Sequence, residues 1–219
     1  MLFLFAAGLL GGCQEYKPDE QAPEPVEPKV QEVDPATEDL VLEPQWLKGD
    51  RWVWSDGYGL KVDSSGPDGT VFKRIDDDKQ WLKRRGLTVI ESQSARTHRK
   101  LLYKTGDPAD IFPLKIGNTA VYEREYSSNG VLRVHRTSWV VEGRETIEVP
   151  AGTFDTWRLV RRSRSTLTGW TGYERWWYSP DVRNYVRMEF RYGGAPASSR
   201  VLMAYTLAPR VQLNTESPR

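Results

Sequence analysis

The amino-acid sequence predicts a mainly β protein with little helix, built as an antiparallel curved sheet or an open barrel. Short apolar runs separated by turn residues are the first sign. The clearest turn is Ser127-Ser128-Asn129-Gly130, because Asn-Gly between apolar runs favours a hairpin. Tryptophan, tyrosine, valine and threonine are frequent in these runs, as strands prefer. The third sign is a period-2 alternation of apolar and charged residues between positions 185 and 207.

Turn signals divide the second part of the chain into expected strands. They are predicted at 52–54, 70–75, 87–90, 100–104, 119–126, 131–141, 145–149, 153–164, 173–178, 185–192 and 200–207. Turns are expected at Glu142-Gly143 and at Pro150-Ala151-Gly152, where glycine can adopt a positive φ angle. No stretch of 15 residues has a helical apolar stripe, and residues 76–85 are the best candidate for a short helix.

The last two expected strands indicate which side chains face the core. The expected apolar faces are Val186, Met188, Phe190 and Tyr192 in one strand and Val201, Met203, Tyr205 and Leu207 in the other. Tyr185, Arg187, Glu189 and Arg191 are placed on the opposite face of the first strand. One apolar and one charged face is typical of an antiparallel sheet that is wet on one side.

A short internal similarity raises the possibility of two similar β subdomains. Residues 47–54 contain Leu-Lys-Gly-Asp before Trp-Val-Trp, and residues 114–122 contain Leu-Lys-Ile-Gly-Asn before Ala-Val-Tyr. Both segments open a series of expected strands of similar length, which is the pattern of a duplication.

The N-terminal residues predict export and a lipid anchor. Residues 2–12 are apolar or glycine, too short a stretch to cross a bilayer as a helix, and they end in Leu10-Gly11-Gly12 before Cys13. This segment resembles the lipobox of bacterial lipoproteins, which implies that residues 1–12 are a signal peptide and that Cys13 becomes the lipidated first residue. No basic residue precedes the apolar run, as expected if translation starts upstream. Gln14 after the cysteine favours sorting to the outer membrane, with the protein on its periplasmic face. The alternative is a buried segment with an incidental cysteine.

Residues 13–44 predict a disordered acidic linker. Between residues 14 and 44 ten acidic residues and six prolines accompany two lysines, which gives this stretch a charge of −8. Few apolar side chains are available to offset the entropy of ordering it. Because the whole chain carries +1, the residues after the linker carry +9. The expected organisation is therefore an acidic tether, a basic β domain at 45–210 and a flexible tail at 211–219.

Three motifs in the second half match a known pattern in order and spacing. Residues 112–117 read FPLKIG, residues 148–156 read EVPAGTFDT, and residues 174–180 read ERWWYSP, followed by Val186-Arg187. Residues 112–192 resemble a β domain of uncharacterised bacterial exported lipoproteins, with the pattern PLKxG, VPAGTFD and WYSP. The resemblance implies a β fold in the cell envelope and no established activity.

Catalytic and metal-binding motifs are missing from the sequence. His98 and His135 are the only histidines and the single cysteine is Cys13, so neither a zinc site nor another cofactor is expected. The Asp76-Asp77-Asp78 run lacks the spacing of a calcium-binding EF-hand loop. No nucleophile elbow, phosphate-binding loop or dinucleotide fingerprint is present. The carboxylate pairs Glu123–Glu125 and Glu174–Glu189 are of a kind that any charged β protein contains. The sequence therefore favours a non-catalytic protein.

Arginine and aromatic residues are dense in the second half and suggest a binding surface. The candidate binding patch consists of Arg158, Arg162, Trp170, Arg175, Trp177, Arg187 and Arg191. Arginine recognises phosphate and carboxylate groups, so lipopolysaccharide, peptidoglycan or an acidic envelope protein are the expected partners, while nucleic acid is not. The alternative is that tryptophans fill the core and arginines coat the wet face.

The main functional hypothesis is an interaction or structural module tethered to a membrane through its lipid anchor. A periplasmic carrier of a lipid or another hydrophobic ligand is the alternative, and it requires a cavity of roughly several hundred Å³. A cell-wall hydrolase is a third hypothesis and requires convergent carboxylates or a histidine in a cleft.

Overall fold

The structure, a computed structural model, describes residues 40–210. The predicted signal peptide 1–12, Cys13, residues 14–39 of the predicted linker and the predicted tail 211–219 lie outside the described residues. In the described part the chain forms twelve strands and one short 3-10 helix. The strands are β1 (Arg51–Trp54), β2 (Gly59–Gly66), β3 (Gly69–Arg74), β4 (Trp81–Arg85), β5 (Thr88–Gln93), β6 (His98–Thr105), β7 (Thr119–Ser128), β8 (Val131–Val149), β9 (Gly152–Ser165), β10 (Thr171–Ser179), β11 (Asn184–Tyr192) and β12 (Ser198–Thr206), and the 3-10 helix is η2 (Pro108–Ile111).

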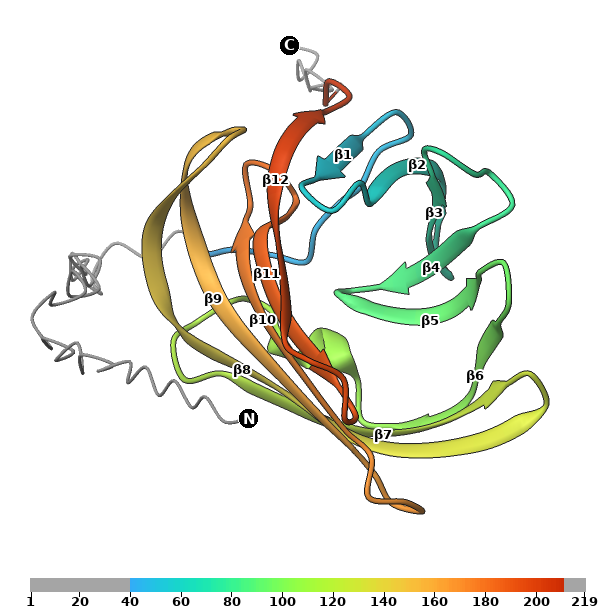
Figure 1. Cartoon of the computed structure of the whole chain (residues 1–219). Coiled ribbons are helices and arrows are strands. Elements are labelled where there is room, and N and C mark those ends of the chain that lie inside the picture. The colour runs from blue at the N-terminus through green and yellow to red at the C-terminus, as the bar shows by residue number, and fades with distance from the viewer. Residues whose placement is uncertain (1–39, 211–219) are drawn as a thin grey trace, which may run out of the picture. The chain divides into compact units, whose positions relative to one another are not determined.

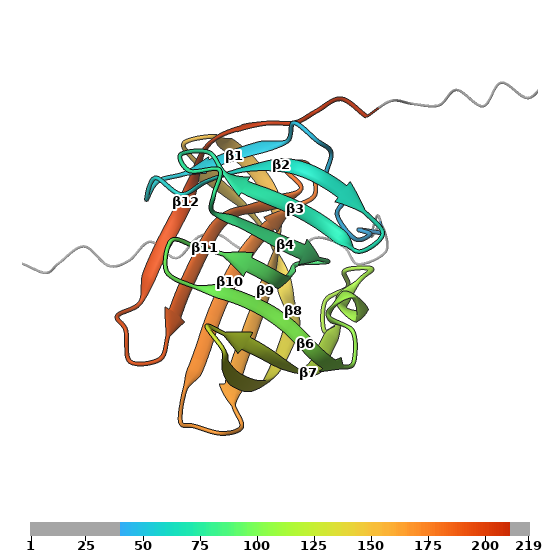
Figure 2. The ribbon, with the colours of Figure 1, turned by 90° about the vertical axis from the view of Figure 1, so that its right-hand side faces the viewer.

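The twelve strands form a closed barrel in sequence order, as Figures 1 and 2 show. Each strand pairs antiparallel with the next, and β1 closes the barrel by pairing with β12, with Trp52 opposite Tyr205. The prediction of a mainly antiparallel β protein is confirmed. The sequence predicts a curved sheet or an open barrel, whereas the barrel is closed, because the short β1 pairs with both β2 and β12.

The expected turn at Glu142-Gly143 is wrong. Val131–Val149 is one strand of 19 residues that pairs with β9 along most of its length. The register shifts between Val141 and Gly143, so a β-bulge accommodates the Glu-Gly pair without ending the strand.

The expected short helix at 76–85 is also wrong. The Asp77 side chain accepts hydrogen bonds from the backbone N of Lys79 at 3.0 Å and from Nε2 of Gln80 at 2.9 Å, which fixes a tight turn. Trp81–Arg85 then forms β4 between β3 and β5, since pairing on both sides satisfies its backbone groups.

Two side-chain faces differ from the expectation. Met203 and Tyr205 are 45% and 38% exposed, whereas Leu202 is fully buried. The register of β1 and β12 shifts between Val53 and Trp54, so Leu202 lies opposite the buried Trp54, and the Tyr205 ring lies 5.8 Å from the ring of Phe154 on β9. Tyr185, expected on the charged face, is buried because the register of β10 and β11 shifts between Trp177 and Tyr178.

The two similar sequence segments form matching turns, one before β1–β6 and one before β7–β12. Because all twelve strands belong to one barrel, the segments do not define separate subdomains. Gly49 and Gly117 both have positive φ angles, 103° and 90°. The carbonyl of the residue after each glycine accepts a hydrogen bond from a valine N–H of a following strand. The Asp50 carbonyl accepts from Val62 at 2.8 Å, and the Asn118 carbonyl accepts from Val141 at 3.0 Å.

The loops of the meander alternate between the two ends of the barrel. The loops after β2, β4, β6, β8 and β10 lie at one end, which we call the packed end, and the other loops lie at the opposite end, the cavity end (Figure 2). Trp46, Ile111 and Leu114 are buried at the packed end. Farther inside, the core is aromatic and includes Trp52, Trp54, Phe72, Trp139 and Trp176.

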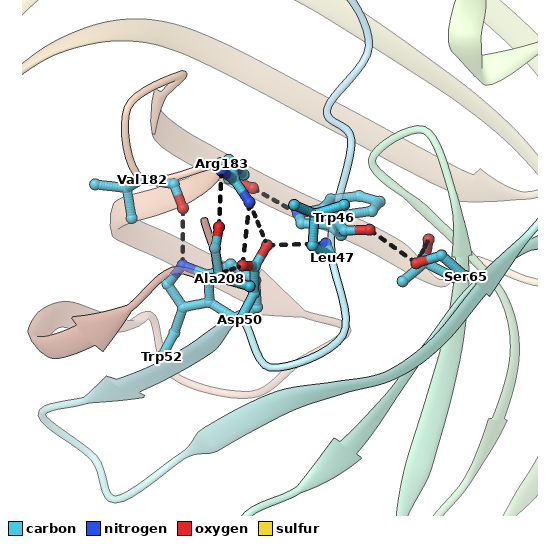
Figure 3. Close-up of polar contacts among 9 residues, drawn as sticks. Trp46, Leu47, Asp50, Trp52, Ser65, Val182, Arg183 and Ala208 are labelled. Atoms are coloured by element: carbon cyan, nitrogen blue, oxygen red, sulfur yellow. Dashed lines mark hydrogen bonds and ion pairs between the residues drawn. The ribbon is translucent and has the colours of Figure 1, made fainter. Parts of the chain in front are cut away.

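A buried ion pair joins the chain segments at the packed end (Figure 3). Nη1 of Arg183 lies 3.1 and 2.9 Å from the two carboxylate oxygens of Asp50. The same carboxylate accepts hydrogen bonds from the backbone N of Leu47 at 3.0 Å and of Ala208 at 2.8 Å. The segments before β1, before β11 and after β12 are therefore held together at one point.

The chain enters the barrel at this packed end. Leu114 in the loop after β6 donates its backbone N–H to the carbonyl of Val41 at 2.9 Å. Gly86, in the turn after β4, donates its backbone N–H to the Glu43 carboxylate at 2.6 Å. Residues 41–43, the last part of the predicted linker, thus contact the barrel at the end opposite the cavity.

Candidate functional site

A cavity of about 660 Å³ occupies the cavity end of the barrel, between the inward side chains of β2 to β11. Its wall includes the β5–β6, β7–β8 and β9–β10 hairpins, which contribute Ser94, Leu132 and Trp170 among others. The cavity reaches solvent beside Leu132 and Leu167, which are 49% and 64% exposed. Its volume is in the range of pockets that hold drug-sized ligands.

The floor of the cavity is built around a buried carboxylate, Glu174 on β10, which is 4% exposed. One oxygen of Glu174 accepts hydrogen bonds from Nη1 of Arg161 and from the hydroxyl of Tyr192, the latter at 2.8 Å. The other accepts from Nε1 of Trp176 at 2.9 Å. Burial alone would lower the pKa of Arg161, but the Glu174 charge outweighs it and raises that pKa. The Glu174 carboxylate thus accepts two hydrogen bonds at one oxygen and one at the other.

A second guanidinium, Arg124 on β7, lines the same cavity. Within residues 40–210 its one hydrogen bond is from Nη1 to the Val89 carbonyl at 3.5 Å, and its Nε is buried without a partner there. The guanidinium lies over the Tyr126 ring, 5.3 Å from the centroid. Burial, and next the positive charge of Arg161, lower the pKa of Arg124. Among residues 40–210, no carboxylate forms an ion pair with Arg124.

Aromatic rings stack along one wall of the cavity. The rings of His135 and Trp170 are stacked at 4.5 Å and 17°, and the Trp170 and Tyr192 rings are parallel within 7° at 6.4 Å. Burial, reinforced by the charge of Arg124 and other arginines, lowers the pKa of His135 to about 4. His135 is therefore neutral at neutral pH, and its Nδ1 is buried without a hydrogen-bond partner.

Positive charge predominates in the cavity lining. Its basic side chains are Arg74, Arg99, Lys100, Arg124, Arg133 and Arg161, and its carboxylates are Glu91 and Glu174. Arg74 is paired outside the lining with Asp76, through contacts of 2.8 and 2.6 Å. The cavity thus combines aromatic and aliphatic walls with an excess of cations.

The structure brings six of the seven predicted patch residues together on the outer wall of β9, β10 and β11. Cross-strand pairing aligns them in three adjacent rows on that wall: Arg158–Trp177–Arg187, Val160–Arg175–Glu189 and Arg162–Tyr173–Arg191. Trp170 is separated from this group, because the β9–β10 hairpin carries it into the cavity. We call the six remaining residues the outer arginine surface.

Much of the outer arginine surface is neutralised by carboxylates. Glu145 contacts Nη1 of Arg158 at 2.9 Å, and Glu189 contacts Nη2 of Arg187 at 2.7 Å. Trp177 is only 6% exposed and donates its Nε1–H to Glu145 at 2.9 Å, so its ring is not free to stack on a ligand. Arg187 covers that ring, 4.6 Å from its centroid.

Of the arrangements that a hydrolase would need, the structure places one histidine, His135, in the cavity, and it separates the carboxylate pair Glu174–Glu189. Glu174 points into the barrel, whereas Glu189 lies in the outer row with Arg175, so this carboxylate pair does not converge on a substrate. Within residues 40–210, no group of three or more histidine, cysteine, aspartate or glutamate side chains is placed to hold a metal ion. In the same residues, no helix is long and apolar enough to cross a membrane.

Comparison with known proteins identifies the fold. Neither the protein-family models nor the curated proteins give a match to this sequence, so the resemblance of residues 112–192 to exported lipoproteins stays a prediction. The crystal structure of the hypothetical lipoprotein YmcC from Escherichia coli matches with a TM-score of 0.50 and 12% identity, over 74% of this chain and 85% of that chain. The chain shares the YmcC-like fold. At this identity the likeness concerns the fold alone.

Two other crystal structures match less well. A candidate lipoprotein from Parabacteroides distasonis has 18% identity and a TM-score of 0.40, and a candidate exported protein with a YmcC-like fold from Bacteroides fragilis has 16% and 0.41. In both cases the match covers 77% of this chain and 100% of the other. These scores are too low to support an argument about function.

Sequence reasoning missed the residues of the cavity floor. Arg124, Arg161, Glu174 and Tyr192 were not grouped, and His135 was considered only as a metal ligand. One signal was present in the sequence: Arg161 occupies the same face of β9 as Leu159, a fully buried residue, so an arginine lies where the alternation predicts a core position.

Proposed function

We propose that this protein is a lipid-anchored protein of the cell envelope that binds a ligand within its barrel and carries out no catalysis. The supporting observation is the cavity of about 660 Å³, which satisfies the size that a carrier requires. The presence of this cavity favours a carrier over a purely structural module. The proposed location is the periplasmic face of a membrane, the outer membrane by the prediction from Gln14.

The position of the cavity suits a tethered binding protein. Val41 and Glu43 contact the packed end, so the predicted tether joins the barrel opposite the cavity. The proposed anchor at Cys13 would then leave the mouth of the cavity accessible. A tether of residues 13–39 in polyproline form would span about 84 Å, at about 3.1 Å per residue.

The test is to purify the full chain from its envelope in mild detergent and to identify co-purified small molecules by native mass spectrometry. We expect one ligand per protein. Leu101→Trp should lower its amount, because Leu101 lines the cavity and the larger ring would fill it. Leu102→Trp is the matched control, since the neighbouring side chain is 58% exposed. Absence of any bound ligand, together with failure to bind added amphiphiles, would refute the carrier function.

The anchor is tested separately. Cys13→Ser should release the protein from the membrane fraction into the soluble periplasmic fraction, because the thioether-linked lipid can no longer form. A variant that still sediments with membranes would show that the lipid anchor is not what holds it there. Ligand binding by the soluble variant should be unchanged.

A second candidate function is docking of an envelope partner on the outer wall. Arg136, Arg164 and Arg191 are exposed there around a shallow hollow lined by Tyr173, and within residues 40–210 none of the three forms an ion pair. Lipopolysaccharide, peptidoglycan or an acidic envelope protein would fit this charge. A photo-crosslinking residue at position 191 should capture such a partner in intact envelopes, and the same residue at exposed Leu102 should not.

A further inference from the structure

We propose that the cavity recognises an anionic amphiphile, with the acidic group at Arg124 and Arg161 and the apolar part along the aromatic and aliphatic wall. This inference rests on the proposed ligand-binding function and names the class of ligand. The acidic group is a phosphate or a carboxylate, which guanidinium groups bind through the same pairs of N–H donors.

The cavity floor carries more positive than negative charge. Two guanidinium groups, Arg124 and Arg161, share a single carboxylate, Glu174. Glu174 accepts hydrogen bonds from Arg161, Trp176 and Tyr192, and in the described part of the chain it forms neither a hydrogen bond nor an ion pair with Arg124. A partly buried cation without a counter-ion is costly, and an anion in the cavity would remove that cost.

Three side-chain nitrogen atoms of the cavity lining have no hydrogen-bond partner within residues 40–210. Nε of Arg124, Nε of Arg161 and Nδ1 of His135 are all buried and unsatisfied, and all three side chains line this cavity. Buried polar groups are usually hydrogen-bonded in native proteins. Six other side-chain atoms of residues 40–210 are also buried without a partner, and these three differ from them in belonging to residues that line one cavity.

The rest of the cavity wall contains both basic and apolar side chains. Arg99, Lys100 and Arg133 add positive charge to the lining, which favours the entry of an anion. Apolar surface for the rest of the ligand comes from the lining residues Val89, Ile90, Leu101, Leu132, Leu167 and Trp170. An inorganic anion alone would leave this surface in contact with water, and for this reason we infer an amphiphile.

The experiment compares three probes of equal chain length: decyl phosphate, decanoate and uncharged 1-decanol. Binding to the delipidated Cys13→Ser protein is followed by tryptophan fluorescence, because Trp170 lies in the cavity wall. The wild-type cavity should bind the two anionic probes at least tenfold more tightly than 1-decanol, as expected for a charge-assisted hydrogen bond. Inorganic phosphate should bind at least tenfold more weakly than decyl phosphate, since it lacks the apolar part.

Arg124→Met removes the charge and keeps a similar length. It should abolish the preference for anionic probes while leaving the affinity for 1-decanol within about threefold. Arg164→Met is the matched control, because Arg164 is exposed on the outer wall. A second measurement uses the protein with Arg124 intact. Decyl phosphate should raise the pKa of the His135 imidazole, because an adjacent anion favours its protonated form, and NMR titration of the imidazole measures this shift.

The outcomes separate the two proposals. If none of the three probes binds, this inference is wrong, and the carrier function is wrong as well if no ligand co-purifies with the full chain. If all three bind equally, or if Arg124→Met keeps the preference for anions, the cavity holds a ligand but not by recognising an acidic group there. If inorganic phosphate binds as tightly as decyl phosphate, the amphiphile is wrong and the site is one for a free anion.

Discussion

The buried carboxylate of Asp50 should be the most sensitive point of the barrel. Asp50 is fully buried, and Arg183, Leu47 and Ala208 all donate hydrogen bonds to it (Figure 3). Asp50→Asn keeps the shape but removes the charge, and it replaces one acceptor oxygen with an NH₂ group that faces other N–H donors. The Arg183 side chain, 8% exposed, would then be buried without a counter-ion.

The expected cost follows from these contacts. Removing one partner of a buried ion pair typically costs about 3–5 kcal/mol. We therefore expect Asp50→Asn to lower the free energy of unfolding by about 3–5 kcal/mol. A second substitution, Arg183→Met, should restore at least about 1 kcal/mol in the Asp50→Asn background, because it removes the unpaired charge.

Urea denaturation followed by circular dichroism measures both variants, with the transition checked for two-state behaviour. Asp63→Asn is the control. Asp63 pairs with Lys73 at 3.0 Å but its side chain is 39% exposed, so its loss should cost less than about 1 kcal/mol. The reasoning fails if Asp50→Asn costs no more than Asp63→Asn, since the carboxylate would then not hold the packed end together.

Two further predictions concern the cavity and the strand register. His135 has a pKa of about 4 against an ordinary value of 6.5, so its folded state favours the neutral ring and loses stability as pH falls from 6.5 toward 4. Between pH 7.5 and 5 the wild-type protein should lose about 2 kcal/mol more than His135→Asn, measured by urea denaturation at each pH; equal losses would contradict the lowered pKa. Leu202→Ala should cost about 2–5 kcal/mol because Leu202 is fully buried, whereas Met203→Ala should cost less than about 1 kcal/mol; the reverse order would show that β12 faces the other way.

The strands could be placed from the sequence where turn chemistry is explicit. Asn129 and Gly130 have positive φ angles of 52° and 78° at the tip of the β7–β8 hairpin, as the Asn-Gly signal predicts. Closure was not predictable, because it depends on pairing between β1 and β12, about 150 residues apart. The face of β12 was misassigned because strict alternation does not foresee the register shift between Val53 and Trp54, which places Leu202 opposite the buried Trp54 and leaves Met203 exposed.

The outer arginine surface was predictable because it follows a simple rule. Every second residue of a strand faces the same side, and residues directly opposite one another on neighbouring strands form a row. Arg158, Trp177 and Arg187 therefore meet on one wall. Trp170 does not follow the rule, since it lies in the connection between β9 and β10, and a loop residue has no face that alternation can assign. Its place in the cavity is set by stacking on His135.

The inward positions change in character along the barrel axis, and this change carries the functional argument. On β8 the inward residues pass from Val141 and Trp139 in the core to His135 in the cavity, and on β9 they pass from Leu159 to Arg161. Filling the same positions with aliphatic side chains would extend the core and stabilise the barrel by about 1.5–3 kcal/mol per large side chain. Charged groups kept there, with donors left unsatisfied, are therefore a cost to folding, and binding of an anion would offset it. Substituting Arg124 by methionine should, on this reasoning, leave the ligand-free protein at least as stable as the wild type.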